Sequence, residues 1–245
     1  MRCVILAAGT STRLRPLTDE TPKCLLPLGA QTILSKMLSA LHAHACNEIA
    51  IVTGFCEEKI CRYVRKNFSS ATIHFIFNEH FATTNNASSL LLAEEFIGEN
   101  EFLLLDSDIV FDNEVLSRVV HSSHHHNNCA AVRTNGVFGS EEIKVSINKQ
   151  NQILQIGKEV ASNEAFGESV GIEKFSRATT KKLFTTLKKR IMHEQRTTEF
   201  YEASFQEMID DGEVLHAVDL GTLRCIEIDT IEDYEMAQRV FVLEK

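Results

Sequence analysis

Short apolar runs alternate with longer amphipathic stretches in the first third of the chain. Residues 4–7 (VILA), 48–53 (EIAIVT) and 72–77 (TIHFIF) have the length and composition of buried strands. Between them, residues 31–45 and 57–68 carry apolar side chains at helical spacing. Strands that alternate with helices predict a parallel sheet, in which ligands bind beyond the carboxyl ends of the strands.

The pattern changes in the second half of the chain. Apolar runs separated by turns predict antiparallel strands there, followed by helices; these expected elements are strands at 129–134, 143–147 and 153–156 and helices at 177–190 and 199–211. The segment RCIEIDTIEDYEMAQRVF then predicts a last strand followed by a helix. No repeat or linker divides the chain, so we expect a single α/β domain over residues 1–245: a mostly parallel sheet flanked by helices, with a small mixed region.

Composition narrows the function classes. The 245 residues are 44% hydrophobic and carry a formal net charge of −9, which disfavours nucleic acid as a partner. No apolar run approaches the roughly 20 residues of a membrane span. The seven cysteines are odd in number and contain no CxxC pair, as in a cytoplasmic protein with reduced thiols. Since the first strand begins at once, we expect no signal peptide.

The loop after the first strand has the composition of a phosphate-binding loop. Residues 8–12 are all small, and Arg13 and Lys23 follow them. Small residues let backbone N–H groups approach a polyphosphate, and the basic side chains can neutralise its charge. All three prolines lie between Arg15 and Leu28 and stiffen this segment. The alternative is an ordinary turn with a basic surface loop.

Carboxylates and amides follow other predicted strands. Asp106 and Asp108 end an apolar run, and because adjacent carboxylates repel each other, a bound divalent cation would explain them better than a polar turn. Asp229 follows the last strand, where it can be a metal ligand or a helix cap. His124, His125 and His126 lie in a polar turn, and we expect them to be solvated rather than metal-bound.

The segment LAAGTSTRLRPLT, followed by TPKCLLPL, resembles the signature of nucleotidyltransferases that join an NTP to a phosphorylated acceptor and release pyrophosphate. The family pattern is L-A-A-G-x-G-T-R-L-x-P-L-T and then P-K, from which this chain departs at Ser11. The resemblance implies a Rossmann-like nucleotidyltransferase sheet. It also implies that the loop binds the nucleotide through Leu6, Ala7, Ala8, Gly9, Thr10 and Ser11.

The resemblance assigns further roles near the phosphates. Arg13 would hold the leaving pyrophosphate and Lys23 would stabilise charge at the α-phosphate. Asp108 and Asp229 would hold Mg²⁺, with Asp106 beside the nucleotide. Nearby, the TNNASSL segment resembles the choline-phosphate and phosphonate cytidylyltransferase branch, in which this loop contacts the nucleobase; the residues implied are Asn78, Asn85, Asn86 and Ser88.

The same resemblance places the acceptor near the C-terminal half. Lys158 would bind the acceptor's phosphate, unless it is a surface lysine. Glu168, Tyr201 and Glu202 would surround a cationic head group, with Phe200 beside them. The chain lacks the long C-terminal extension found in many sugar-activating members, which leaves a compact site for a small acceptor activated with CTP. The absence of tryptophan favours a primary amine such as 2-aminoethylphosphonate over phosphocholine.

Two other functions stay open from the sequence. One is a sugar-1-phosphate nucleotidyltransferase that uses UTP or dTTP. The other is an inactive nucleotide-binding regulator, against which Arg13, Lys23, Asp108 and Asp229 argue because all four are present. A homo-oligomer is also possible.

Overall fold

A computed structural model describes residues 1–69, 72–122, 128–136 and 138–243. The histidines at 124–126 lie outside the described residues. Within the described part of the chain, no helix has both the length and the apolar character that crossing a membrane requires.

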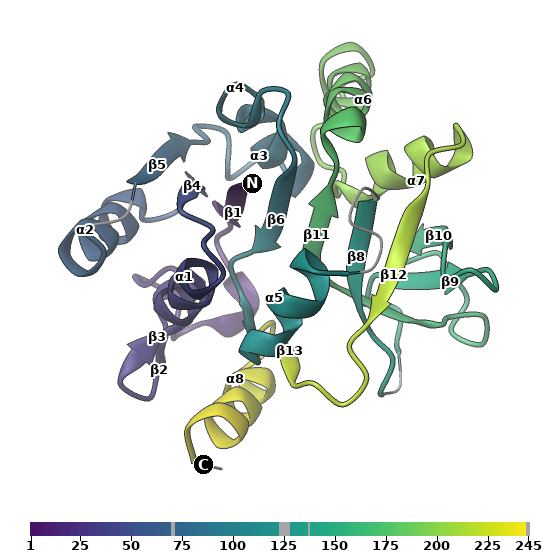
Figure 1. Cartoon of the computed structure of the whole chain (residues 1–245). Coiled ribbons are helices and arrows are strands. Elements are labelled where there is room, and N and C mark those ends of the chain that lie inside the picture. Colours follow the sequence, from purple (N-terminus) through teal and green to yellow (C-terminus); the bar gives the residue numbers. More distant parts are fainter. Residues whose placement is uncertain (70–71, 123–127, 137, 244–245) are drawn as a thin grey trace.

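A large mixed sheet forms the centre of the molecule (Figure 1). Its strands are β1 (Arg2–Ala7), β4 (Glu48–Thr53), β5 (Thr72–Phe77), β6 (Phe102–Asp106), β8 (Asn128–Arg133), β9 (Lys144–Ile147), β10 (Ile153–Gly157), β11 (Gly167–Phe175) and β12 (Leu215–Asp219). The order is β10-β9-β11-β6-β1-β4-β5, with β8 paired to β11 and β12. Strands β1, β4, β5 and β6 are parallel, whereas β11 runs antiparallel to β6.

Helices cover both faces of the sheet. Because side chains alternate along β1, Cys3 and Ile5 enter one core while Val4 and Leu6 enter the other. The first core contains α1 (Ile33–Ala43), α2 (Glu57–Asn67) and α5 (Asn113–Val120). The second contains α3 (Asn86–Leu92), α4 (Glu94–Ile97), α6 (Arg177–Lys188) and α7 (Glu202–Asp210). This three-layer arrangement confirms the α/β fold class.

A smaller layer closes one end of the sheet. It consists of the hairpin β2 (Pro27–Leu28) and β3 (Gln31–Thr32), the ribbon β7 (Ile109–Phe111) and β13 (Cys225–Glu227), and α8 (Ile231–Gln238). Figure 1 shows α8 beside this ribbon, near the C-terminus. The buried side chains of Leu14, Leu28, Val110 and Ile228 form a separate core beneath it. This layer therefore joins the beginning of the chain to its end.

Some element bounds differ from the sequence expectation. Strands β4 and β5 have the predicted bounds, but α1 begins only at Ile33 because Thr32 caps it and pairs reciprocally with Ser35. Helix α7 begins at Glu202 rather than at residue 199. The sequence pattern does not predict β12, which lies parallel to β8 at the far side of the mixed region.

Candidate active site

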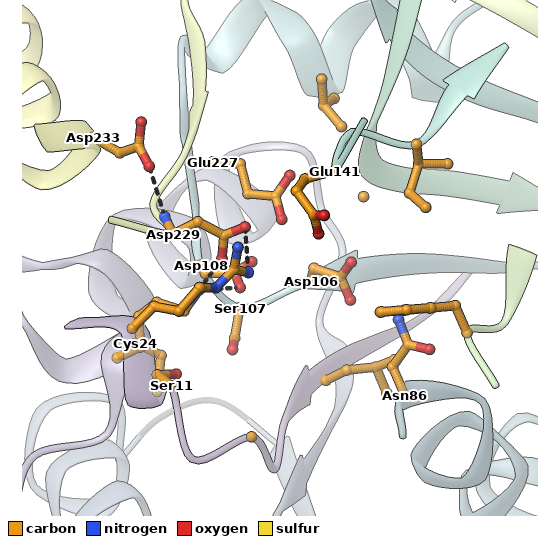
Figure 2. Close-up of a pocket in the computed structure, with 18 of the residues that line it drawn as sticks. Ser11, Cys24, Asn86, Asp106, Ser107, Asp108, Glu141, Glu227, Asp229 and Asp233 are labelled. Carbon is orange, nitrogen blue, oxygen red and sulfur yellow. Dashed lines mark hydrogen bonds and ion pairs between the residues drawn. The ribbon is translucent and has the colours of Figure 1, made fainter. Parts of the chain in front are cut away.

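A cavity of about 850 Å³ opens at the carboxyl ends of β1 and β6. The last residues of these parallel strands are paired, Leu6 of β1 with Asp106 of β6 and Ala7 of β1 with Thr53 of β4. The loops that follow the strands therefore leave the sheet at the same edge, where the cavity lies. The loop after β1 forms one wall. The ribbon β7–β13 and α8 supply the acidic residues at one end, and β11 and the start of α7 supply the other end (Figure 2).

The loop after β1 approaches the cavity with little side-chain bulk. A side chain on Gly9 would meet no atom within 4 Å, so its backbone lies open to the cavity. Ser11 has a positive φ of 49°, and its carbonyl accepts the hydroxyl of Thr18 at 2.8 Å. Lining residues are Leu6, Ala7, Ala8, Gly9 and Ser11. Thr10 does not line the cavity, so its expected part in nucleotide binding stays a prediction.

Lys23 and Arg13 meet the acidic end of the cavity. Lys23 Nζ lies 2.8 Å from Asp108 Oδ2 and 2.9 Å from Asp229 Oδ1. Arg13 Nη2 lies 2.7 Å from Asp229 Oδ2. Burial opposes the Lys23 ammonium, but the two carboxylates outweigh burial and raise the pKa of Lys23 above its ordinary value. Burial opposes the Asp229 carboxylate too, yet Lys23 and Arg13 lower the pKa of Asp229.

Asp108, Asp229 and Glu227 can place three carboxylate oxygens within 4.8 Å of one another. Three carboxylates are a donor set that suits Mg²⁺. Asp108 Oδ1 is also buried without a hydrogen-bond partner among the described residues, as expected of an oxygen that binds a ligand or a metal ion. These residues fit a divalent cation.

Glu227 is the member of this group that the sequence reasoning missed. It lines the cavity, where burial and then the carboxylates of Asp108 and Asp229 raise its pKa well above the ordinary value. The available signal was strand alternation: Glu227 stands two residues after the buried Cys225 and two before Asp229. Asp229 itself is not the cap of α8, since Thr230 and Asp233 form that capping box.

Asp106 belongs to a second acidic group, which lies beside β11 and the start of α7. Its Oδ2 accepts the hydroxyl of Tyr201 at 2.8 Å, and Gly171 lies so close that a Cβ there would be 2.7 Å from the same oxygen. Burial, then Asp108 and Glu202, raise the pKa of Asp106 well above its ordinary value. Burial together with the Asp106 and Glu202 charges does the same to Glu173.

Tyr201 and Glu202 have different relations to this cavity. Tyr201 is fully buried and does not line it; its hydroxyl contacts Asp106, which does line it. Glu202 does line it and is only 6% exposed, and its Oε2 has no hydrogen-bond partner in the described structure. Burial raises the pKa of Glu202 to about 7.

The asparagine-rich segment reaches the cavity only in part. Asn85 and Asn86 line it. Asn78 is buried, donates to Thr84 at 3.2 Å and Ser89 at 3.0 Å, and does not line the cavity. Ser88 does not line it either and donates to the carbonyl of Thr197 at 3.1 Å. Both side chains are therefore bonded within the fold, and the nucleobase contacts expected of Asn78 and Ser88 stay predictions.

Lys158 and Glu168 both line the cavity, and each is paired with an opposite charge. Lys158 Nζ lies 2.9 Å from Glu141 Oε2 and 5.0 Å from the centre of the Phe200 ring. Glu168 is buried and accepts from Arg133, whose Nε lies 3.0 Å away. Burial raises the pKa of Glu168 although Arg133 opposes the shift.

Known proteins share both this sequence and this fold. A family model described as the MobA-like NTP transferase domain matches residues 3–207. The CTP:phosphoglutamine cytidylyltransferase of Campylobacter jejuni is 26% identical over 96% of this chain and 98% of its own length. The CMP-5'-(3-aminopropyl)phosphonate synthase of Streptomyces rubellomurinus is 34% identical over 49% of this chain, and the matched part spans only 19% of that longer protein.

A solved structure of the CTP:phosphocholine cytidylyltransferase from Streptococcus pneumoniae superposes with a TM-score of 0.80, at 21% identity and over 98% of both chains. That likeness confirms the fold. The family match covers most of the chain, including the loop after β1, Lys23 and Asp108. The chain therefore belongs to the MobA-like NTP transferase domain family, which confirms that it is a nucleotidyltransferase.

Proposed function

We propose that this protein transfers CMP from CTP to a small phosphorylated or phosphonate acceptor that carries a primary amine, with Mg²⁺ as the metal. The observation that carries the transfer reaction is the meeting of Lys23 with Asp108 and Asp229 at 2.8 and 2.9 Å, in the cavity that the small-residue loop also lines. Backbone N–H groups, a buried ammonium and a carboxylate group are the parts that binding and activating a triphosphate requires.

In this reaction an oxygen of the acceptor's phosphate or phosphonate attacks the α-phosphorus of CTP. The new O–P bond forms as the bond to the β-phosphate oxygen breaks, and pyrophosphate leaves with that electron pair. The attacking oxygen is already anionic near neutral pH, so the residues need not remove a proton from it. Catalysis then depends on position and on charge stabilisation.

The chain's own residues have separate tasks in this step. Lys23 moves from Asp108 and Asp229 toward the α-phosphate and stabilises the charge that develops there. Arg13, which is largely exposed and bound to Asp229, binds the departing pyrophosphate. Asp108, Glu227 and Asp229 would hold Mg²⁺, which supplies positive charge that neutralises the triphosphate.

The acceptor's amine is proposed from the charges at the opposite end of the cavity. Glu168 is paired with Arg133, and Glu141 is paired with Lys158. Asp106 and Glu202 line the cavity, and neither forms a salt bridge with a cation of the described chain. A primary ammonium can donate N–H bonds to these carboxylates, whereas a quaternary ammonium has no hydrogen to donate.

CTP is proposed as the donor because curated relatives act with cytidine nucleotides on amine-bearing acceptors. The printed names include CTP:phosphoglutamine cytidylyltransferase and CMP-5'-(3-aminopropyl)phosphonate synthase. Phosphoglutamine, 2-aminoethylphosphonate and 3-aminopropylphosphonate are therefore the first acceptors to test. Phosphocholine tests the quaternary ammonium.

The experiment measures pyrophosphate release with each of CTP, UTP, ATP and dTTP, in the presence of Mg²⁺, against these acceptors and glucose-1-phosphate. We expect CTP with a primary-amine acceptor to give the highest kcat/KM. Asp108→Asn is the inactive control, since it keeps the shape of the side chain but removes its charge. If glucose-1-phosphate with UTP or dTTP wins by tenfold or more, the amine proposal is wrong. If CTP binds but no acceptor releases pyrophosphate, the protein is a nucleotide-binding regulator.

A further inference from the structure

The first turn of α3 holds a distant segment of the chain, residues 197–201, by several hydrogen bonds. Asn85 donates from its backbone N–H to the carbonyl of Thr197 at 2.9 Å and from Nδ2 to the carbonyl of Thr198 at 3.2 Å. Ser88 donates from its hydroxyl to the carbonyl of Thr197 at 3.1 Å. The segment around Asn85 and Ser88, which the family resemblance assigns to the nucleobase, thus binds the backbone of residues 197–198.

Asn86 makes the bond nearest to the acceptor side. Its Oδ1 accepts the backbone N–H of Tyr201 at 2.9 Å, directly before α7 begins at Glu202. Figure 2 shows Asn86 at the same end of the pocket as Asp106. Tyr201 in turn donates its hydroxyl to Asp106. Asn86 therefore fixes the backbone of Tyr201. The side chain of Tyr201 contacts the Asp106 carboxylate, and the next residue, Glu202, supplies a second carboxylate.

The other side of this segment is also held. Arg190 lies 2.7 Å from Glu199, and it also contacts Glu207 of α7 at 2.5 Å. Arg190 is largely buried, so these contacts are shielded from water better than a surface ion pair is. With α3 on one side and Arg190 on the other, the segment that carries Phe200 has two fixed anchors.

On these contacts we propose that Asn86 is a positioning residue for acceptor recognition, and that its carboxamide sets the place of Tyr201 and Glu202 rather than reading the nucleobase. This inference rests on the proposed function, because it assumes that Glu202 and Asp106 bind the acceptor's ammonium. A carboxylate holds an ammonium well only at hydrogen-bonding distance, so a displaced start of α7 weakens acceptor binding. Nucleotide binding, which uses the loop after β1, is left intact.

The test compares Asn86→Ala with Asn86→Asp. The alanine removes the acceptor of the Tyr201 N–H, whereas the aspartate keeps an oxygen there and is favourable in the first turn of a helix. Loss of one such hydrogen bond is worth about 1 kcal/mol, so Asn86→Ala is expected to raise the acceptor KM by about fivefold to tenfold. Asn86→Asp is expected to keep the acceptor KM near that of the wild type.

Two further measurements separate positioning from base contact. The Kd for CTP, measured by calorimetry without acceptor, is expected to stay within about twofold of wild type in Asn86→Ala, since a 1.4 kcal/mol contact would change it tenfold. Amide hydrogen exchange at Tyr201 is expected to become faster in that variant. Asn47→Ala, which removes an exposed asparagine bonded to His42, controls for a general loss of stability.

The other possible results contradict either the positioning role of Asn86 or the proposed function. If Asn86→Ala weakens CTP binding and leaves the acceptor KM unchanged, Asn86 contacts the nucleotide and the positioning role is wrong. Unchanged exchange at Tyr201 in Asn86→Ala contradicts it as well. If wild-type protein turns over no acceptor at all, the proposed function fails and this inference fails with it.

Discussion

The two ends of the cavity have similar numbers of acidic side chains, but the partners of these side chains differ. At the ribbon end, Asp108 and Asp229 are paired with Lys23, and Asp229 also with Arg13. At the α7 end, Asp106, Glu173 and Glu202 surround the Tyr201 hydroxyl, and the described structure gives them no salt bridge. Burial, together with repulsion from neighbouring carboxylates, raises the pKa of Asp106 and Glu173, and burial alone raises the pKa of Glu202.

This difference in pairing bears on the charge of the ligand that each end of the cavity would bind in the proposed reaction. The ribbon end already contains cations, which in the proposed reaction would contact the anionic triphosphate, while Asp108, Glu227 and Asp229 would hold Mg²⁺. At the α7 end, burial outweighs the attraction of Lys23 for Asp106 and of Lys158 for Glu202. An ammonium on the proposed acceptor would stabilise these carboxylates. The predictions that follow change one end at a time.

The largest expected effect comes from removing a carboxylate at the ribbon end. Asp108→Ala and Asp229→Ala are each expected to abolish pyrophosphate release, because the metal loses a ligand. The fold is expected to persist, since Lys23 keeps the remaining carboxylate as a partner. Calorimetric titration with Mg²⁺ and CTP should show weakened metal binding. Near-normal turnover at ordinary Mg²⁺ would remove that residue from the metal site.

The next effect in size concerns Lys23. Lys23→Ala is expected to lower kcat by about 10²–10³, the usual loss when a preorganised charge at the transition state is removed. Asp108 and Asp229 then lack their ammonium, so Mg²⁺ is expected to raise the Tm of this variant more than that of wild type. A variant whose only defect is a higher KM would show that Lys23 binds the ground state alone.

A smaller effect is expected at the α7 end. Glu202→Gln keeps the shape of the side chain and is expected to lower kcat/KM for 2-aminoethylphosphonate by about tenfold to a hundredfold, the worth of a hydrogen bond to a charged group. The matched substrate is 2-hydroxyethylphosphonate, which has no ammonium and should be affected little. An equal loss for both substrates would mean that Glu202 does not recognise the amine.

The smallest effect is on stability and depends on pH. Folding raises the pKa of Glu202 from 4.5 to about 7, so the folded state binds the proton more tightly than the unfolded state does. Wild-type stability is therefore expected to fall as pH rises from about 4.5 through 7, by at most about 3 kcal/mol from this group. Glu202→Gln lacks this loss, and its Tm should exceed that of wild type at pH 8 but not at pH 5.

The local sequence predicted much of the wall that β1 and the loop after it form. The apolar run of β1 and the small residues after it predicted a strand and a loop, because strand length and side-chain volume are local properties. The expected pairing of Asp108 with Asp229 as metal ligands required a further step, because these residues lie far apart in the sequence and are brought together by the β7–β13 ribbon. Family resemblance supplied that step. Glu227 was missed because alternation along a three-residue strand is a weak signal, although it places Glu227 on the same face as Asp229.

The acceptor side shows where sequence reasoning ends. Asn78, Asn85, Asn86 and Ser88 are polar residues near a helix start, and their spacing is equally consistent with ligand contacts and with contacts inside the fold. Only the packing of residues 197–201 against α3 shows that Ser88 and Asn86 bind backbone there. The same holds for Tyr201, which is amphipathic in sequence but fully buried in the structure.

The sequence by itself determined the α/β class, the small-residue loop after β1 and the chemical types of the groups that could hold a metal. These depend on residue type, on spacing within one element, and on a motif whose residues are contiguous. Tertiary structure decided which charges are paired and which are left for a ligand, as Glu168 with Arg133 and Glu202 with its unpartnered oxygen show. The physical reason is that the energy of a buried charge depends on neighbours brought close by the fold, and those neighbours lie far away along the chain.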